Sequence, residues 1–208
     1  MIAIIDYGAG NLQSVQKALD FIGAKNLITD SKSEIEAADA VILPGVGSFG
    51  DAMDCLTKSG LLDTVRAAAL SDTPFLGICL GLQMLFEKSE ESVGVEGLSV
   101  LEGEVRRFPK EIGLKIPQIG WNSLEIVPDC PLYSGVPNGA YVYFVHSYYL
   151  TAKNRENVAA TAEYGITFDA SAMDVRKNLY ATQFHPEKSG AVGLQILRNF
   201  AELQKGVR

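Results

Sequence analysis

The sequence predicts an α/β fold with a mostly parallel central sheet, flanking helices and an added small β region. Over the first 90 residues, apolar strand-like runs alternate with segments of helical spacing. The connections between them are short, which is typical of a parallel sheet with helices on both faces. From about Val93 to Ser134 the pattern changes to shorter β-like stretches separated by Gly and Pro.

The elements of the first half follow in order along the chain. Met1–Asp6 is a short apolar run that predicts a buried strand. Asn11–Ile22 carries its apolar residues at helical spacing, and Gly23 marks the end of that helix. The next predicted elements are strands at Lys25–Thr29 and Ala40–Leu43, one or two helices within Phe49–Leu70, a strand at Pro74–Ile78 and a helix at Leu80–Glu87.

The second half contains fewer clear elements. Tyr141, Tyr143 and Val145 alternate with their neighbours as in a strand. Leu179–Phe184 predicts another strand, and Ala191–Leu203 a closing helix. Because no internal repeat and no linker rich in Pro, Gly or Ser is present, we expect residues 1–208 to form one domain.

Composition and charge narrow the class of protein. The chain has 47% hydrophobic and 21% charged residues, a formal net charge of −7, and no Lys/Arg block longer than two residues, so nucleic-acid binding is not expected. No apolar run reaches the ~20 residues of a membrane span, and no signal peptide is predicted. Three irregularly spaced cysteines argue against a disulfide framework. We therefore expect a cytoplasmic protein.

Cys79 is the candidate nucleophile. Gly77-Ile78-Cys79-Leu80-Gly81 has the G-x-nucleophile-x-G form at the point where a predicted strand passes into a helix. Such an elbow strains the nucleophile's backbone, and the helix N-terminus favours the thiolate form of a cysteine. A small cysteine buried in the sheet core is the alternative, and the pentapeptide alone leaves both open. Cys55 and Cys130 have no comparable context.

His185 is the candidate base for this nucleophile. The chain has two histidines, and a nucleophilic cysteine needs a base that is itself oriented by a third group. His185 follows a predicted strand, and Glu187 stands two residues later, on the same side of an extended backbone that Pro186 should maintain. His146 has no carboxylate at this spacing, which favours an interior hydrogen-bonded role for it.

A glycine motif at residues 45–50 has two interpretations. Gly45-Val46-Gly47-Ser48-Phe49-Gly50 fits the G-x-G-x-x-G pattern of a dinucleotide-binding loop. However, it follows an interior strand, and no second strand ending in an acidic residue lies ~20 positions further on. A glycine loop at a strand end also turns backbone N–H groups toward a developing oxyanion. We favour the oxyanion loop.

Several motifs together carry a family resemblance. The segments 77–83 (GICLGLQ) and 184–187 (FHPE) resemble the class I, triad glutamine amidotransferases. Four further segments narrow the resemblance to the glutaminase subunits of imidazole glycerol phosphate synthase: 7–11 (YGAGN), 44–50 (PGVGSFG), 120–122 (GWN) and 143–148 (YFVHSY). The resemblance runs from about residue 5 to about residue 190.

The resemblance implies a set of roles. Cys79 would attack the carboxamide of glutamine, with His185 as base and acid and Glu187 orienting it. The remaining implied contacts are an oxyanion hole formed by the Leu80 N–H and the Gly45-Val46-Gly47 loop, and substrate contacts from Gln83, Glu91, Ser147 and Tyr148. No metal and no cofactor are expected.

The resemblance also implies a partner. Ammonia would pass to a separate (βα)₈-barrel subunit that makes imidazole glycerol phosphate and AICAR in histidine biosynthesis. The implied docking face and ammonia passage comprise Asn11, Trp121, Asn122, Tyr143 and Lys188. Two alternatives stay open here: the glutaminase subunit of pyridoxal-phosphate synthase, and an α/β protein with a cysteine elbow but no amidotransferase activity.

Overall fold

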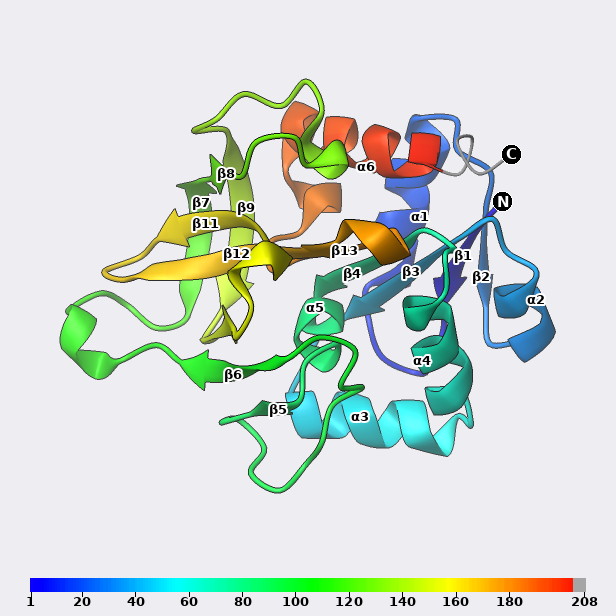
Figure 1. Ribbon diagram of the computed structural model, residues 1–208, viewed down its shortest axis with the longest axis horizontal. Helices are drawn as coiled ribbons and strands as arrows, with labels where there is room; N and C mark the ends of the chain where they lie inside the picture. Colours follow the sequence, from blue (N-terminus) through cyan, green and yellow to red (C-terminus); the bar gives the residue numbers. More distant parts are fainter. Residues whose placement is uncertain (204–208) are drawn as a thin grey trace.

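Strands and helices alternate along the first half of the chain in the computed structural model, which describes residues 1–203 (Figure 1). The first half contains β1 (Ile2–Ile5), α1 (Leu12–Phe21), β2 (Asn26–Thr29), α2 (Lys32–Glu36), β3 (Ala40–Gly45), α3 (Phe49–Lys58), α4 (Leu62–Leu70), β4 (Phe75–Cys79) and α5 (Leu80–Met84). The second half contains β5 (Lys88–Ser89), β6 (Gly103–Arg107), β7 (Gln118–Ser123), β8 (Glu125–Ile126), β9 (Tyr141–His146), β10 (Tyr148–Ala152), β11 (Val158–Glu163), β12 (Thr167–Asp174), β13 (Leu179–Thr182) and α6 (Gly190–Leu203). Residues 204–208 of the predicted domain lie outside the described residues.

One large sheet connects most of these strands. Its order is β2-β1-β3-β4-β13-β12-β10-β6-β5. β2, β1, β3, β4 and β13 pair in parallel, and antiparallel pairs then carry the sheet through β12 and β10 to β6. A separate two-stranded sheet joins β7 and β9. The predicted α/β class with an added β region is confirmed.

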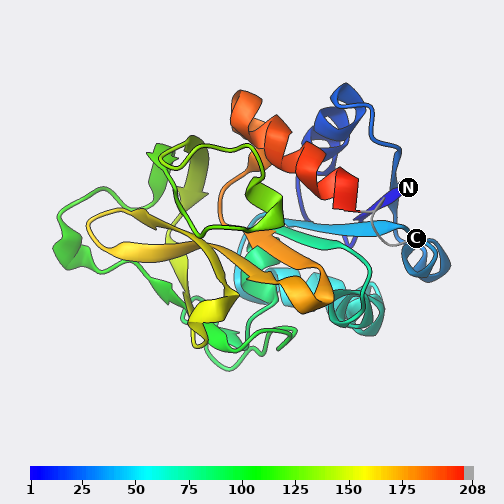
Figure 2. The same cartoon turned by 45° about the horizontal axis from the view of Figure 1, so that its top comes forward.

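Helices cover both faces of the parallel part, and the side-chain alternation of its strands explains why. In β1, Ala3 and Ile5 join the core formed with α2, α3, α4 and α5, whereas Ile2 and Ile4 join the core formed with α1 and α6. Every residue of β1 is fully buried, as expected of a strand covered on both faces. Figure 2 shows α1 and α6 together on one side of the sheet and α3 and α4 on the other.

Two predicted elements end two or more residues earlier in the structure. The helix predicted at Leu80–Glu87 ends at Met84, because the chain turns and the Glu87 N–H donates to the Gly103 carbonyl at 3.3 Å. The strand predicted at Leu179–Phe184 ends at Thr182, after which the His185 N–H donates to the Tyr143 carbonyl of β9 at 3.0 Å. The segment Phe49–Leu70 forms two helices, α3 and α4. Five further helices and strands, α2, β5, β10, β11 and β12, were not predicted.

No helix within residues 1–203 combines the length and apolar character needed to cross a bilayer.

Candidate active site

Cys79 occupies a strained elbow between β4 and α5. Its backbone has φ 55° and ψ −107°, a region that non-glycine residues rarely adopt and that costs about 1–3 kcal/mol. The two flanking glycines permit this geometry. A Cβ on Gly81 would lie 1.9 Å from the Leu43 carbonyl oxygen of β3, and one on Gly77 would lie 2.8 Å from the Gly81 carbonyl oxygen. The predicted elbow is therefore present, and its glycines are required by close backbone packing.

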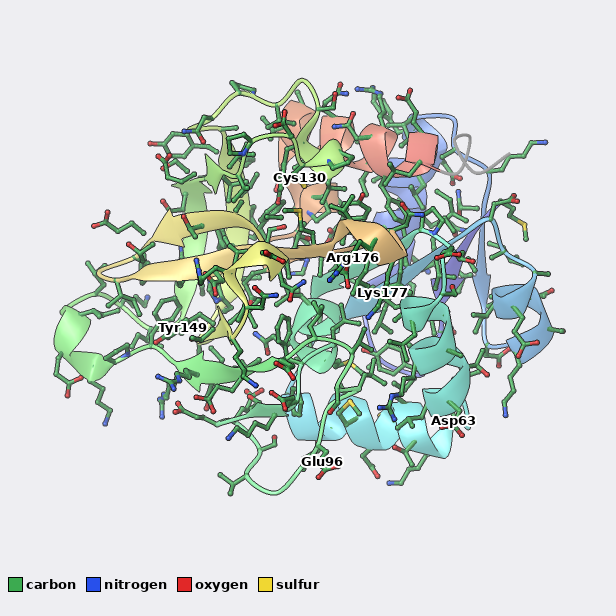
Figure 3. The ribbon with its side chains drawn as sticks, in the orientation of Figure 1. Asp63, Glu96, Cys130, Tyr149, Arg176 and Lys177 are labelled. Carbon is green, nitrogen blue, oxygen red and sulfur yellow. The ribbon has the colours of Figure 1, made fainter. Side chains whose placement is uncertain are left out.

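The other two cysteines have different surroundings. Cys55 is half-buried on α3. Cys130 is buried in the coil beside α6 (Figure 3), where it lines a second cavity away from Cys79. Burial raises the pKa of the Cys130 thiol, which disfavours its reactive thiolate form.

His185 and Glu187 form a buried pair beside the elbow. His185 Nδ1 lies 2.8 Å from Glu187 Oε1, and the two side chains are 3% and 1% exposed. The expected extended backbone at Pro186 is wrong, because Pro186–Lys188 forms a single 3-10 turn that begins directly after His185. The fixed φ of proline suits the first position of a helical turn. The turn, rather than a strand, brings the carboxylate back to the imidazole ring.

The charge of His185 is set by its neighbours. Burial disfavours the imidazolium, but interactions with Cys79 and then with Glu187 outweigh it and raise the pKa of His185 to about 9. The ring is therefore protonated at neutral pH and donates from Nδ1 to Glu187. In the described part of the chain Nε2 has no hydrogen bond of ordinary geometry, which leaves it free to exchange a proton with the sulfur or with a bound substrate.

A cavity of about 360 Å³ opens over the sulfur and the imidazole. Its walls collect residues from segments far apart in the sequence, and they include most of the predicted site. The predicted residues that line it are Cys79, His185, Val46, Gly47, Leu80, Gln83, Glu91, Ser147, Tyr148 and Lys188. Glu187 lies behind His185, and Gly45 and Asn11 border a small crevice next to both.

The glycine loop of residues 45–47 lies against the elbow. Gly45 is paired with Cys79 across the β3–β4 ladder, and a Cβ on Gly45 would lie 2.9 Å from the Gly81 nitrogen. Tyr7 fixes the start of the loop, since its buried hydroxyl donates to the Pro44 carbonyl at 3.0 Å. Gly47 has φ 101°, a conformation that favours glycine.

The N-terminus of α3, which follows this loop, is already capped. Phe49 N–H donates to Glu91 Oε2 at 2.8 Å, and Gly50 N–H to Ser92 Oγ at 2.9 Å. The next N–H, that of Asp51, donates to Ser48 Oγ at 3.3 Å. Since the first three amides are occupied and one partner is a carboxylate, a dinucleotide pyrophosphate would find no free donors here. This geometry favours the oxyanion interpretation of the motif.

Two predicted substrate contacts have structural partners of their own. Glu91 holds the start of α3 while it lines the cavity. Gln83 Nε2 donates to the Tyr148 carbonyl at 3.2 Å and to Gln183 Oε1 at 2.9 Å, so this amide nitrogen is directed into the protein.

His146 has the interior role that the sequence favoured. Its Nδ1 lies 2.8 Å from the Tyr148 carbonyl oxygen and its Nε2 lies 3.0 Å from the Gln118 amide. Burial, opposed by the hydrogen bond to Tyr148 and reinforced by the charge of His185, lowers the pKa of His146 to about 4. His146 is thus a neutral residue that holds the backbone at one wall of the cavity.

Strand alternation places the residues predicted for a docking face on different sides of the β7–β9 sheet. Trp121 of β7 and Tyr143 of β9 are directly paired, with ring centroids 6.1 Å apart in a T-shaped arrangement. Trp121 is 56% exposed. Asn122 points to the other side of β7, where its Nδ2 donates to the Glu163 carbonyl at 2.7 Å. Lys188 lies at the cavity rim.

Gln183 is a residue at this site that sequence reasoning missed. It is fully buried, and its Nε2 donates to Cys79 Sγ at 3.7 Å. The sequence contains no local signal for it, because β13 ends at Thr182 and the contact with Cys79 depends on the pairing of β13 with β4.

The comparison with family models decides the family. The model described as glutamine amidotransferase class-I matches residues 3–203. The chain belongs to the class-I glutamine amidotransferase family. The elbow, the His185–Glu187 pair and the cavity described above are thus features of a class-I amidotransferase.

Curated relatives cover nearly the full chain. A protein of Methanosarcina mazei named imidazole glycerol phosphate synthase subunit HisH is 52% identical over 202 residues, which are 97% of this chain and 98% of the relative. A protein of the same name from Thermosynechococcus vestitus is 53% identical over 206 residues, or 98% and 97% of the two chains.

Solved structures share the fold at lower identity. A structure described as a glutamine amidotransferase has a TM-score of 0.75 at 19% identity, covering 99% of this chain and all of the other. The glutaminase domain of Trypanosoma brucei CTPS with bound acivicin has a TM-score of 0.68 at 15% identity, covering 97% and 93% of the two chains.

Proposed function

We propose that this class-I amidotransferase is the glutaminase subunit of an imidazole glycerol phosphate synthase and that Cys79, His185 and Glu187 carry the hydrolysis of glutamine. The observation that carries the proposal is the elbow thiol beside a buried, charged His–Glu pair at the floor of one cavity. Curated relatives of about 50% identity bear the imidazole glycerol phosphate synthase name, which favours this function over a pyridoxal-phosphate synthase subunit. The family match disfavours an α/β protein without amidotransferase activity.

The reaction follows from the position of each group. The Cys79 thiolate attacks the carboxamide carbon of glutamine, and the N–H groups of Leu80 and the 45–47 loop receive the negative charge that develops on oxygen. The C–N bond then breaks as His185 gives its proton to the leaving ammonia. Water, deprotonated by His185, hydrolyses the thioester and releases glutamate.

The cavity walls suit the head group of glutamine. We propose that the Glu91 carboxylate, which the Phe49 N–H holds in place at 2.8 Å, attracts the α-ammonium group. Gln83, Ser147 and Tyr148 complete the wall around the substrate. Since Gln83 directs its amide nitrogen inward, we propose that its contribution to substrate binding is to fix the Tyr148 backbone.

The outward face of the β7–β9 sheet is proposed to dock the synthase subunit. Ile119, Trp121 and Tyr141 are exposed by 59%, 56% and 59%, and strand alternation places them on one face with Tyr143 and Val145. Val145 also lines the cavity, so the face reaches the active site. Buried aromatic anchors are common at interface centres. We propose a (βα)₈-barrel partner, with Asn11 and Lys188 as neighbouring contacts, whereas the Asn122 side chain lies on the other side of β7.

Affinity labelling tests the hydrolytic function. A chloroketone analogue of glutamine should add once to the protein, at Cys79, and excess glutamine should prevent the addition. Cys55, which is half-buried, serves as the internal control thiol. Peptide mass spectrometry that finds equal labelling of Cys55 and Cys79, or no protection by glutamine, would contradict the proposal.

We propose that residues 1–208 form one amidotransferase domain, supported by the match of residues 3–203 to a single family model. A cytoplasmic location fits the biosynthetic role and the free thiols of Cys55, Cys79 and Cys130.

A further inference from the structure

Gln183 is a fully buried amide that contacts the sulfur of Cys79 and has no part in the triad. It lies between the end of β13 and His185, and none of its surface is exposed. Its Nε2 lies 3.7 Å from Cys79 Sγ, a distance suited to an N–H···S hydrogen bond. Only the nitrogen end of the amide can donate to the sulfur, so the role of Gln183 depends on which end faces Cys79.

The hydrogen bonds of Gln83 determine the orientation of the Gln183 amide. A backbone carbonyl only accepts hydrogen bonds, so the Gln83 atom 3.2 Å from the Tyr148 carbonyl oxygen is its nitrogen. The same nitrogen contacts the Gln183 side chain at 2.9 Å, and it can only donate there as well. The Gln183 oxygen therefore faces Gln83, and the Gln183 nitrogen faces Cys79. The amide orientation is fixed by the network.

The network begins at a group that does not titrate near neutral pH. His146 Nδ1 donates to the same Tyr148 carbonyl at 2.8 Å. Burial and the charge of His185 keep the pKa of His146 at about 4, so this ring stays neutral. From His146 through Tyr148 and Gln83 to Gln183, the chain of hydrogen bonds presents a donor of constant charge to the sulfur.

We propose that Gln183 is a further catalytic residue, whose side-chain N–H donates to the Cys79 sulfur and stabilises the thiolate. The inference rests on the proposed role of Cys79 as the nucleophile. The proton of the thiol passes to His185 Nε2, and no bond to Gln183 forms or breaks. A group that only donates favours the charged form of its partner. Because the amide is neutral, it does not compete with His185 for the proton.

A purely structural role for Gln183 is the alternative. Gln183 also accepts from Gln83 and so links the end of β13 to α5, and its backbone N–H donates to the Ala170 carbonyl at 2.9 Å. Either role predicts that its replacement lowers stability. Only the thiolate role predicts a change in how the reactivity of Cys79 depends on pH.

The test is the pH profile of Cys79 alkylation by iodoacetamide, measured by peptide mass spectrometry in the wild type and in two variants. Gln183→Met keeps the bulk and removes the donor, and its midpoint should move up by about one pH unit, with about tenfold slower alkylation below both midpoints. Gln183→Glu keeps an oxygen for Gln83 and places a carboxylate against the sulfur, so its midpoint should move further in the same direction.

Asn199→Leu is the matched control. Asn199 is a buried amide on α6 that donates to the Leu132 and Ser134 carbonyls at 2.9 and 2.8 Å, and it does not line the cavity. Its replacement should lower the melting temperature and leave the alkylation midpoint unchanged. An unchanged midpoint in the Gln183 variants would overturn the inference while Cys79 remained the nucleophile. Loss of the nucleophile role itself would appear separately, as glutaminase activity that survives Cys79→Ala.

A measurement on the wild-type protein tests the hydrogen bond even if neither Gln183 variant folds. As Cys79 titrates, one of the two Gln183 side-chain amide protons, the one that faces the sulfur, should move downfield in ¹H–¹⁵N spectra. Equal shifts of both protons, or none, would contradict the hydrogen bond.

Discussion

Gly81→Ala should displace the nucleophile without changing any group that takes part in the chemistry. An added Cβ would lie 1.9 Å from the Leu43 carbonyl oxygen and 3.0 Å from its carbon, so the start of α5 must move from β3 by about 1 Å or more. A displacement of about 1 Å in a catalytic group lowers turnover about 10²-fold. Overpacking of this kind also costs about 1–3 kcal/mol of stability. Because alanine is favoured over glycine by about 1 kcal/mol within a helix, local propensity would not explain the loss.

The assay is glutaminase turnover in the presence of the synthase subunit, together with the free energy of unfolding in urea. Gly113→Ala is the control: Gly113 has φ 69° and no atom within 4 Å of an added Cβ, so the change costs about 1–2 kcal/mol through the backbone alone. It should lower stability and leave turnover unchanged. If Gly81→Ala keeps turnover within about tenfold of the wild type, the close packing of the elbow against β3 is not needed for catalysis.

Three further changes test separate parts of the site. Glu187→Gln should lower kcat about 10²-fold, since the imidazolium of His185 loses its charged partner, and steady-state kinetics should show a smaller loss for His146→Gln. The unfolded His146 ring binds a proton near pH 6.5 but the folded ring only near its pKa of about 4, so the wild-type unfolding free energy falls as the pH falls from 6.5 to 4. His146→Gln removes this group and should flatten the pH dependence of the unfolding free energy in that window. Trp121→Ala should weaken binding of the synthase subunit by about 2 kcal/mol in calorimetry. The control is Phe21→Ala, which removes a 73% exposed aromatic side chain on α1 and should leave binding unchanged. Equal effects of the two changes would refute the docking face.

The parallel half of the fold was predictable because its sequence pattern is strong. β1, β3 and β4 are continuous apolar runs, and α1 has clear helical spacing. β12 was missed because it is buried along most of its length yet contains Asp169, Ser171 and Asp174, which give no apolar run and no regular alternation. Asp169 is buried there because Arg155 binds both of its oxygens, at 2.7 and 2.9 Å. Such a long-range pair cannot be inferred from local sequence.

The candidate site was predictable where local spacing fixes geometry. The elbow at Cys79 and the proximity of His185 to Glu187 both depend on neighbours within a few residues. The 3-10 turn at Pro186 was not anticipated, because proline suits an extended segment as well as the first residue of a turn. The contact of Gln183 with Cys79 joins residues 104 positions apart, so it depends on the pairing of β13 with β4.

The most direct test of the proposed mechanism compares two nitrogen sources in the assembled synthase carrying Cys79→Ala. The account predicts that glutamine no longer supports formation of imidazole glycerol phosphate, whereas ammonium salts support it at the wild-type rate, because only the source of ammonia has been removed. Cys55→Ala, a change at the half-buried thiol on α3, should leave both activities intact. Glutamine-dependent synthesis by the Cys79→Ala enzyme within about tenfold of the wild type would contradict the assignment of Cys79 as the nucleophile.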